Sequence, residues 1–98
     1  MEEQVKQIAD LLKLLANENR LLIFCALIEK PLVVGEIAER VSGISQSALS
    51  QHLSLLKAHG VLGCTKAGQY VTYFIADQRV VEVIRTLRKY YCNDQEGL

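Results

Sequence analysis

The feature that most constrains the fold is a three-residue connection, Ser42-Gly43-Ile44, between two short segments whose apolar residues recur at helical spacing. The first segment covers residues 33–41. The second covers residues 45–58 and begins with a serine, a residue type that favours the N-cap of a helix. The glycine of the connection can adopt a positive φ, and Gly60 is well suited to end the second helix. Two short helices joined by a tight turn that contains glycine predict a helix-turn-helix.

Further helices are predicted on both sides of this pair. Apolar side chains at helical spacing predict an amphipathic helix over residues 3–15. Asn17 can cap a second helix, and Pro31 would end it. Because this second helix is apolar on most sides, we expect it to lie centrally. Asp77 can cap a last helix, which carries an apolar stripe as far as Tyr91.

A β-hairpin is predicted between the helix-turn-helix and the last helix. Its strands are expected at residues 61–65 and 70–75, with a turn at residues 66–69. The chain is therefore predicted to be mainly α-helical with a small β-hairpin, a winged helix-turn-helix of four helices, two strands and a final helix. We expect a single domain over residues 1–98, with an ordered core from 3 to 92 and a frayed tail at 93–98.

Charge is unevenly distributed along the sequence, although the formal net charge of the 98 residues is zero. Residues 41–76 contain no Asp or Glu, and their basic residues are Lys57, Lys66, His52 and His59. A face that meets a polyanion would therefore be supplied by this stretch, which contains the second helix of the pair and the hairpin.

This second helix has the composition of a helix that contacts DNA. Small polar side chains in its N-terminal half would let it enter the major groove, where Gln46 and Gln51 can pair with adenine edges. Lys57 suits a phosphate, and the hairpin tip would follow the backbone or the minor groove. The predicted DNA-binding residues are Ser45, Gln46, Ser47, Ser50, Gln51, His52, Lys57, Lys66, Gln69 and Tyr70. For His52, the alternative to DNA contact is a structural role. For the whole surface, the alternative is an amphipathic helix whose polar face only meets solvent.

Along essentially its whole length the sequence resembles the ArsR/SmtB family of dimeric repressors. The resemblance is carried by LLKLLANENRLLIFCAL (residues 11–27), VGEIAERV (34–41), SQSALSQHLSLLKAHGVL (45–62) and GQYVTYFI (68–75). It implies a homodimer formed through the first and last helices, and binding to double-stranded operator DNA. It also implies that an inducer acting away from the DNA weakens the complex. Arg20 matches a family arginine that is usually structural or in contact with phosphate.

The metal sites known from this family cannot be assembled from the sequence. The thiolate site needs a CxC-type motif on the third helix, where this chain has VVGEIAERV. The zinc site needs Asp and His on the last helix, and residues 77–95 contain Asp77, Glu82 and Asp94 but no histidine. We therefore predict neither a metal site nor a cofactor.

Three widely spaced cysteines, Cys25, Cys64 and Cys92, match no disulfide framework and no metal-binding motif. The contexts LLIFCAL and LRKYYC around Cys25 and Cys92 resemble the two-cysteine branch of the family. That resemblance implies that reactive sulfur species or an oxidant link the two thiols and weaken operator binding. Arg88 and Lys89 can lower the pKa of Cys92, whereas an apolar setting would raise that of Cys25, so Cys92 is predicted to react first. The alternative is that Cys25 is a core residue and Cys92 an incidental one.

Other functions remain open at this point. Cys64 falls in the first predicted strand and allows, as a second hypothesis, a three-thiolate site for arsenic or a soft metal. A third hypothesis is a DNA-binding regulator without an inducer. The sequence has no nucleophile–base pair, phosphate loop or metal motif, so no enzymatic activity is predicted. Glu2 and Glu3 stand where a signal peptide would be basic, and no stretch is long enough to cross a membrane. We therefore expect a cytoplasmic protein, either a repressor or an anti-silencing activator.

Overall fold

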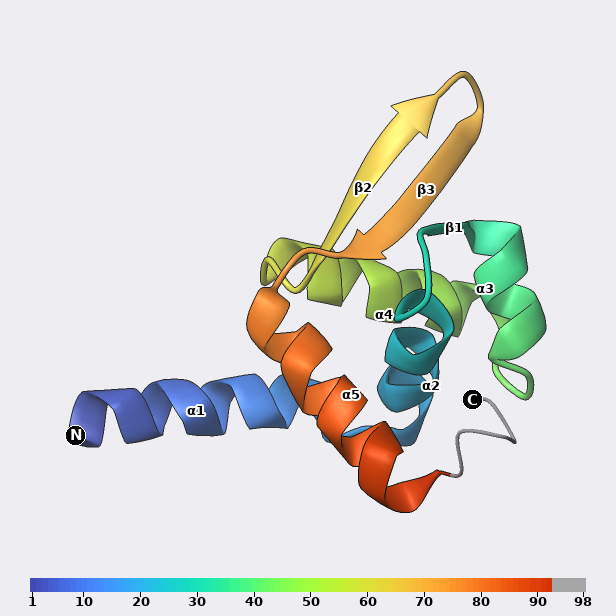
Figure 1. The fold of residues 1–98 in the computed structure, drawn as a ribbon. Coiled ribbons are helices and arrows are strands. Elements are labelled where there is room, and N and C mark those ends of the chain that lie inside the picture. The colour runs from blue at the N-terminus through green and yellow to red at the C-terminus, as the bar shows by residue number, and fades with distance from the viewer. Residues whose placement is uncertain (93–98) are drawn as a thin grey trace.

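The computed structural model describes residues 1–92. Their elements are α1 (Glu2–Leu15), α2 (Glu18–Leu27), β1 (Leu32–Val33), α3 (Val34–Arg40), α4 (Gln46–Ala58), β2 (Leu62–Ala67), β3 (Tyr70–Ile75) and α5 (Gln78–Tyr91) (Figure 1). The predicted winged helix-turn-helix is confirmed, since α3 and α4 form the helix pair, and β2 and β3 form the hairpin, or wing. The predicted frayed tail, residues 93–98, lies outside the described residues.

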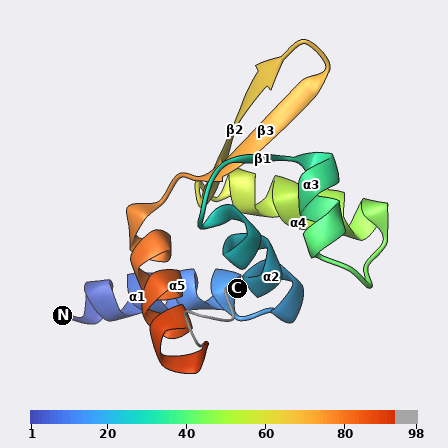
Figure 2. The ribbon, with the colours of Figure 1, turned by 45° about the vertical axis from the view of Figure 1, so that its right-hand side comes forward.

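The sheet has one strand more than the sequence predicted. The strand order is β1-β3-β2, and the two residues of β1 pair antiparallel with Thr72 and Tyr73 of β3. β2 also runs further than expected, because Lys66 and Ala67 pair with β3 and leave Gly68 and Gln69 to make the turn. The resulting wing extends away from the helical body in both ribbon views (Figure 1 and Figure 2).

The predicted helix ends are set by local contacts. The side chain of Asn17 accepts a hydrogen bond from the backbone N–H of Arg20 at the start of α2. Ser45 Oγ accepts one from Ala48 N–H at 3.1 Å at the start of α4, and Asp77 caps α5 in the same way. Gly43 has φ +91° in the connection between α3 and α4. One prediction was wrong: α2 ends at Leu27, before Pro31 is reached.

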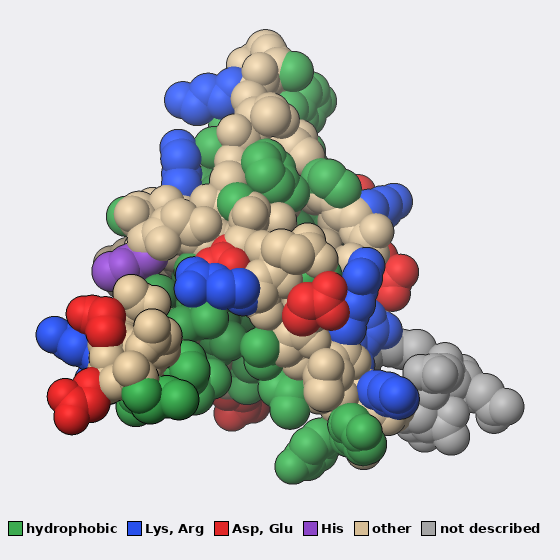
Figure 3. Space-filling model, turned by 60° about the vertical axis from the view of Figure 1, so that its left-hand side comes forward, with side chains coloured by type: hydrophobic (Ala, Val, Ile, Leu, Met, Phe, Trp, Pro, Cys, Tyr) green, Lys and Arg blue, Asp and Glu red, His purple; other side chains and the backbone are tan. Residues whose placement is uncertain are grey.

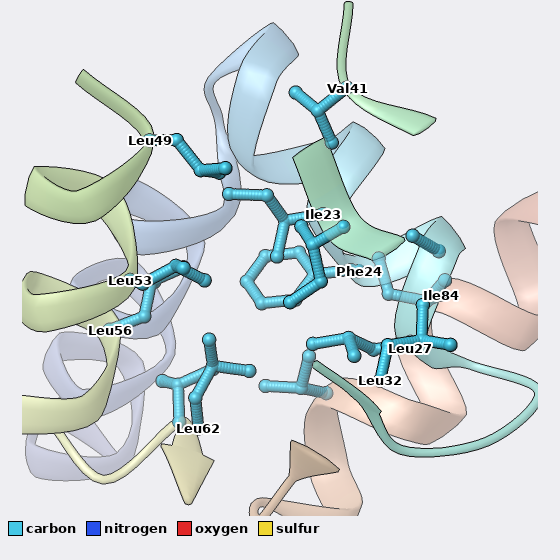
Figure 4. Packing of buried hydrophobic residues seen from close by; sticks show 14 of the residues in the cluster. Ile23, Phe24, Leu27, Leu32, Val41, Leu49, Leu53, Leu56, Leu62 and Ile84 are labelled. Atoms are coloured by element: carbon cyan, nitrogen blue, oxygen red, sulfur yellow. The ribbon is translucent and has the colours of Figure 1, made fainter. Parts of the chain in front are cut away.

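The core surrounds α2, as its apolar sequence predicted. Phe24 of α2 is fully buried, and Figure 4 shows its ring between the leucines of α4 and the side chains of Leu27 and Ile84. Leu49, Leu53 and Leu56 form the buried stripe of α4. Leu55 of α4 is 37% exposed, because it is two residues from Leu53 and therefore lies about 200° around the helix from it.

A second apolar surface is left uncovered in the single chain. Val5, Ile8 and Leu12 on α1 are 48% to 56% exposed, and Leu87 on α5 is also exposed. The space-filling view from the α1 side shows hydrophobic side chains gathered below the wing (Figure 3). Among the described residues, no helix is both long enough and apolar enough to span a bilayer.

Candidate DNA-binding surface and cysteine cavity

Most of the predicted DNA-binding side chains are exposed on α4 and the wing. Those at the N-cap and along α4 are Ser45, Gln46, Ser47, Ser50, Gln51 and Lys57, and those on the wing are Lys66, Gln69 and Tyr70. The serine cap is what starts α4 at this point, so the polar face begins at the first turn of the helix. Only three residues, 59–61, connect α4 to the first strand of the wing, so the two parts of this surface are close together in the sequence.

His52 is the exception, because it is half-buried and makes a contact inside the protein. Its Nδ1 accepts a hydrogen bond of 3.2 Å from Arg20 Nε, and Arg20 Nη1 donates another to the backbone oxygen of Leu14. Arg20 therefore connects the end of α1, the start of α2 and the middle of α4. These contacts favour the structural alternative for His52 and a structural role for Arg20.

The two cysteines predicted to act together line the same cavity. Cys25 comes from α2 and Cys92 follows the last residue of α5, and both are free, half-buried thiols. The cavity has a volume of about 260 Å³, and the remaining side chains that line it are Leu21, Ile84, Leu87, Arg88 and Tyr91. The fold thus brings together two thiols that are 67 residues apart in the sequence (92 minus 25).

The electrostatics of this cavity depend on burial and on one arginine. Burial raises the pKa of the Cys25 thiol above its ordinary value, whereas the positive charge of Arg88 lowers it and a charge on Cys92 raises it. The direction predicted for Cys25 from its apolar helix is therefore confirmed. Lys89, the other cation considered from the sequence, lies over the Tyr90 ring at 5.8 Å from its centroid and does not line the cavity.

Sequence reasoning missed Glu29. Its Oε1 accepts a hydrogen bond of 3.2 Å from Arg88 Nη1, so the two side chains form an ion pair between the end of α2 and α5. The residues are 59 positions apart, and no spacing rule connects them. The one indication in the sequence that Arg88 could influence the thiols was its position one turn before Cys92.

Cys64 does not join the other two thiols. It lies on β2 opposite Tyr73, is half-buried, and is not among the residues that line the cavity of Cys25 and Cys92. Within residues 1–92, no group of three or more His, Cys, Asp or Glu side chains is placed to hold a metal ion. The three-thiolate site considered from the sequence is therefore not formed within the described part of one chain.

Comparison with known proteins decides the family. The model of the bacterial regulatory protein arsR family matches residues 17–62. The chain is 41% identical over 92 residues to the transcriptional activator HlyU of Vibrio cholerae serotype O1. This match covers 94% of this chain and 84% of HlyU. The chain belongs to the ArsR family. The structure of reduced HlyU from V. cholerae N16961 matches with a TM-score of 0.88, covering 95% of this chain and 97% of that one.

Two other ArsR-family relatives support the same assignment. The HTH-type transcriptional regulator YgaV of Escherichia coli K12 is 34% identical over 92 residues, covering 94% of this chain and 93% of YgaV. The structure of the transcriptional repressor BigR from Xylella fastidiosa matches with a TM-score of 0.84 at 30% identity, covering 95% of this chain and 94% of that one. The predicted family and fold are thus confirmed, and the protein is a DNA-binding transcriptional regulator of the ArsR family.

Proposed function

We propose that this ArsR-family regulator is a homodimeric repressor that leaves its operator when Cys25 and Cys92 become covalently linked. The observation that carries the proposal is that both thiols, and only these two of the three cysteines, line one cavity between α2 and α5. Reactive sulfur species or another thiol oxidant would act as the inducer. Because its target is DNA, we place its action in the cytoplasm and assign it no catalytic reaction.

The DNA-binding part of the proposal rests on the exposed face of α4 and on the wing. Gln46 and Gln51 would pair with base edges in the major groove, while the serines near the N-terminus of α4 and Lys57 would contact bases or phosphates. Lys66, Gln69 and Tyr70 would lie against the backbone or in the minor groove. Through its hydrogen bond with Arg20, His52 would orient α4 from the side that faces away from the DNA.

The dimer part of the proposal rests on the uncovered apolar side chains of α1 and α5. Val5, Ile8 and Leu12 would be buried against a second copy, together with Leu87 of α5. Each protomer has only Lys57 and Lys66 as permanent cations in the stretch that faces DNA, so the electrostatic contribution of one protomer is small. A dimer doubles the contacts and gives a two-fold site for a two-fold operator.

The linking reaction can be written with a hydropersulfide, RSSH, as the oxidant. The thiolate of Cys92 attacks the terminal sulfur of RSSH, the S–S bond breaks, and RS⁻ leaves and is protonated. Cys25 then attacks the inner sulfur of the Cys92 persulfide and displaces HS⁻, which forms a disulfide. One RSSH and two thiols thus yield the disulfide, RSH and H₂S. If Cys25 is itself persulfidated by a second RSSH, the same displacement forms a trisulfide.

Linkage would act on DNA binding through the helices that carry the thiols. α2 forms the centre of the core beneath α4, and α5 carries part of the proposed dimer surface, so a bond between them can change the angle between the two α4 helices. A coupling free energy of about 1–3 kcal/mol is typical of allosteric regulators and corresponds to a loss of operator affinity of about 5- to 150-fold.

The test begins with an operator selected from random DNA with the reduced protein. Aliquots are then treated separately with an organic persulfide, with peroxide and with arsenite, and intact mass and operator affinity are measured after each. A link between Cys25 and Cys92 together with weakened binding supports the proposal. Cys64→Ser is the matched control and should respond as the wild type does, whereas Cys25→Ser and Cys92→Ser should bind DNA but not respond. Unchanged affinity after every treatment would reject a thiol sensor and leave a regulator without an inducer.

A further inference from the structure

We propose that Arg88 is a positioning residue for the Cys25 thiolate, and that its ion pair with Glu29 limits how strongly it acts on that thiolate. The inference rests on the proposed function in one respect, because that function makes the Cys25 thiolate the nucleophile of the second step of the linking reaction. It assigns roles to two side chains that lie outside the pair of thiols itself.

The position of Arg88 is the first observation. It precedes Cys92 by four residues, and its backbone oxygen accepts a hydrogen bond of 2.9 Å from the Cys92 N–H. Its side chain lines the cavity and reaches Glu29, which lies just beyond the end of α2 and four residues after Cys25. The guanidinium therefore spans the same α2–α5 gap that a bond between the thiols would span.

The burial of the ion pair is unequal. The Arg88 side chain is 22% exposed, whereas that of Glu29 is 66% exposed. The positive charge thus lies mostly inside the protein at the wall of the cavity, whereas the carboxylate of Glu29 is mostly in solvent. Because an exposed carboxylate is well screened by water, it neutralises the buried guanidinium only in part. Arg88 also lines the apolar cavity, so its positive charge acts on an anion that forms there.

Cys25 is the group best placed to experience this field. It lines the cavity that contains Arg88, Tyr91 and Cys92. It also lines a second cavity, of about 320 Å³, with Leu22, Ala26, Glu29 and Arg40. Arg40 donates from Nη1 to the backbone oxygen of Ala26 at 3.4 Å, so it is held on the α2 backbone. Within residues 1–92, the charged side chains that line these two cavities are Arg88, Glu29 and Arg40, with Cys92 and Tyr91 as titratable neighbours of Cys25.

The chemical consequence concerns the step in which Cys25 displaces HS⁻ from the persulfide of Cys92. The attacking species is the thiolate, and burial alone would make it scarce at neutral pH. Arg88 favours the thiolate over the thiol and holds it on the Cys92 side of α2. Glu29 opposes this effect by drawing the guanidinium toward solvent, and removing its negative charge would strengthen the attraction between Arg88 and the thiolate.

The test measures the ionisation of Cys25 without any persulfide or DNA. In a Cys64→Ser, Cys92→Ser background, Cys25 is the remaining thiol, and the rate of its alkylation by iodoacetamide is recorded as a function of pH. Arg88→Gln should shift this profile to higher pH and slow alkylation at neutral pH about 3- to 10-fold, which corresponds to a pKa change of about half a unit to one unit. Glu29→Gln should shift the profile to lower pH, and Arg88→Lys should restore much of the wild-type profile.

Lys89→Gln is the matched control, because this cation lies next to Arg88 in sequence but is placed over Tyr90. Its profile should equal that of the parent. Loosening of the fold would expose Cys25 and shift the profile to lower pH, so the shift expected for Arg88→Gln cannot come from partial unfolding. The melting temperature of Glu29→Gln must stay within the scatter of the parent for its shift to count. An Arg88→Gln profile that is unchanged, or that moves to lower pH, would overturn the inference. The shift can occur even if persulfides leave operator binding unchanged, so the two proposals fail separately.

Discussion

Arg20 Nε donates a hydrogen bond of 3.2 Å to His52 Nδ1, and this bond attaches α4 to the corner where α1 meets α2. The same guanidinium holds the last turn of α1 through the backbone oxygen of Leu14. A contact that joins the proposed DNA-binding helix to the helix that carries Cys25 provides one physical connection between the two proposed sites. It also means that a substitution of His52 acts on the fold as well as on the DNA-binding surface.

Substitution of Arg20 or His52 should therefore lower stability. Arg20→Ala removes two hydrogen bonds and should reduce the free energy of unfolding by about 1–2 kcal/mol, and His52→Ala should cost about 1 kcal/mol. Urea unfolding measures both. Lys57→Ala, an exposed position on the same helix, should weaken DNA binding without changing stability. If His52→Ala unfolded like the wild type but lost operator binding, His52 would be a direct DNA contact instead.

Gln51 should contribute to the choice of sequence. Gln51→Ala would remove a bidentate contact to a base and should cost about 1–3 kcal/mol of specific binding while leaving binding to random DNA unchanged. Lys57→Ala should instead weaken binding to all sequences and make its salt dependence shallower by about one ion. Competition binding at several salt concentrations separates the two effects. A Gln51→Ala protein with normal operator selectivity would rule out its proposed role in recognising bases.

The exposed apolar face of α1 should hold the dimer together. Ile8→Glu places a charge in this face, and burying that charge against a partner would cost several kcal/mol. The variant should sediment as a monomer at micromolar concentration and bind the operator far more weakly than the wild type. Gln7→Glu, at the neighbouring exposed position of α1, should remain a dimer. A dimeric Ile8→Glu protein would show that α1 is not at the interface.

Asp77 should make the stability of α5 depend on pH. Its hydrogen bonds and ion pair with Arg79, at 2.6 Å between Arg79 Nη2 and Asp77 Oδ2, hold the pKa of this carboxyl below its usual range. A lowered pKa in the folded state stabilises the protein above the unfolded pKa of about 3.9, and this stabilisation is lost as the pH falls toward the folded value. Asp77→Ala should thus cost about 1 kcal/mol at pH 7, as for other lost caps, and the difference from the wild type should shrink below pH 4. Equal differences in urea unfolding at both pH values would contradict this assignment.

Several parts of the fold could be predicted because they depend on neighbours in the sequence. Asn17, Ser45 and Asp77 each cap a helix through a backbone N–H two or three residues ahead, which is a local interaction. The apolar stripe of α4 follows the helical period and therefore indicated which side faces the core, and the apolar residues on most sides of α2 indicated its central position. The exposed polar face of α4 follows from the same period, and the family resemblance extended this local information to the chain as a whole.

Other features exist only because distant segments meet. β1 has two residues, too few to show a period, and is a strand because β3 lies beside it. Gly63 lies where a Cβ would come within 2.6 Å of the Phe74 ring across the wing, which no local rule indicates. Likewise, the bond between Arg20 and His52 joins residues 32 positions apart.

The three-residue connection Ser42-Gly43-Ile44 is one of the features that depend on neighbours in the sequence. Its length and its glycine, which has φ +91°, determine that two helices must meet at a tight turn. The cavity that holds Cys25, Cys92 and Arg88 belongs to the other kind. Sequence alone supplied the helix-turn-helix, because capping and periodicity act within a few residues, and the family resemblance singled out the two thiols. Tertiary structure decided that the thiols share a cavity and that Glu29 forms an ion pair with Arg88, because burial and charge depend on which helices pack together.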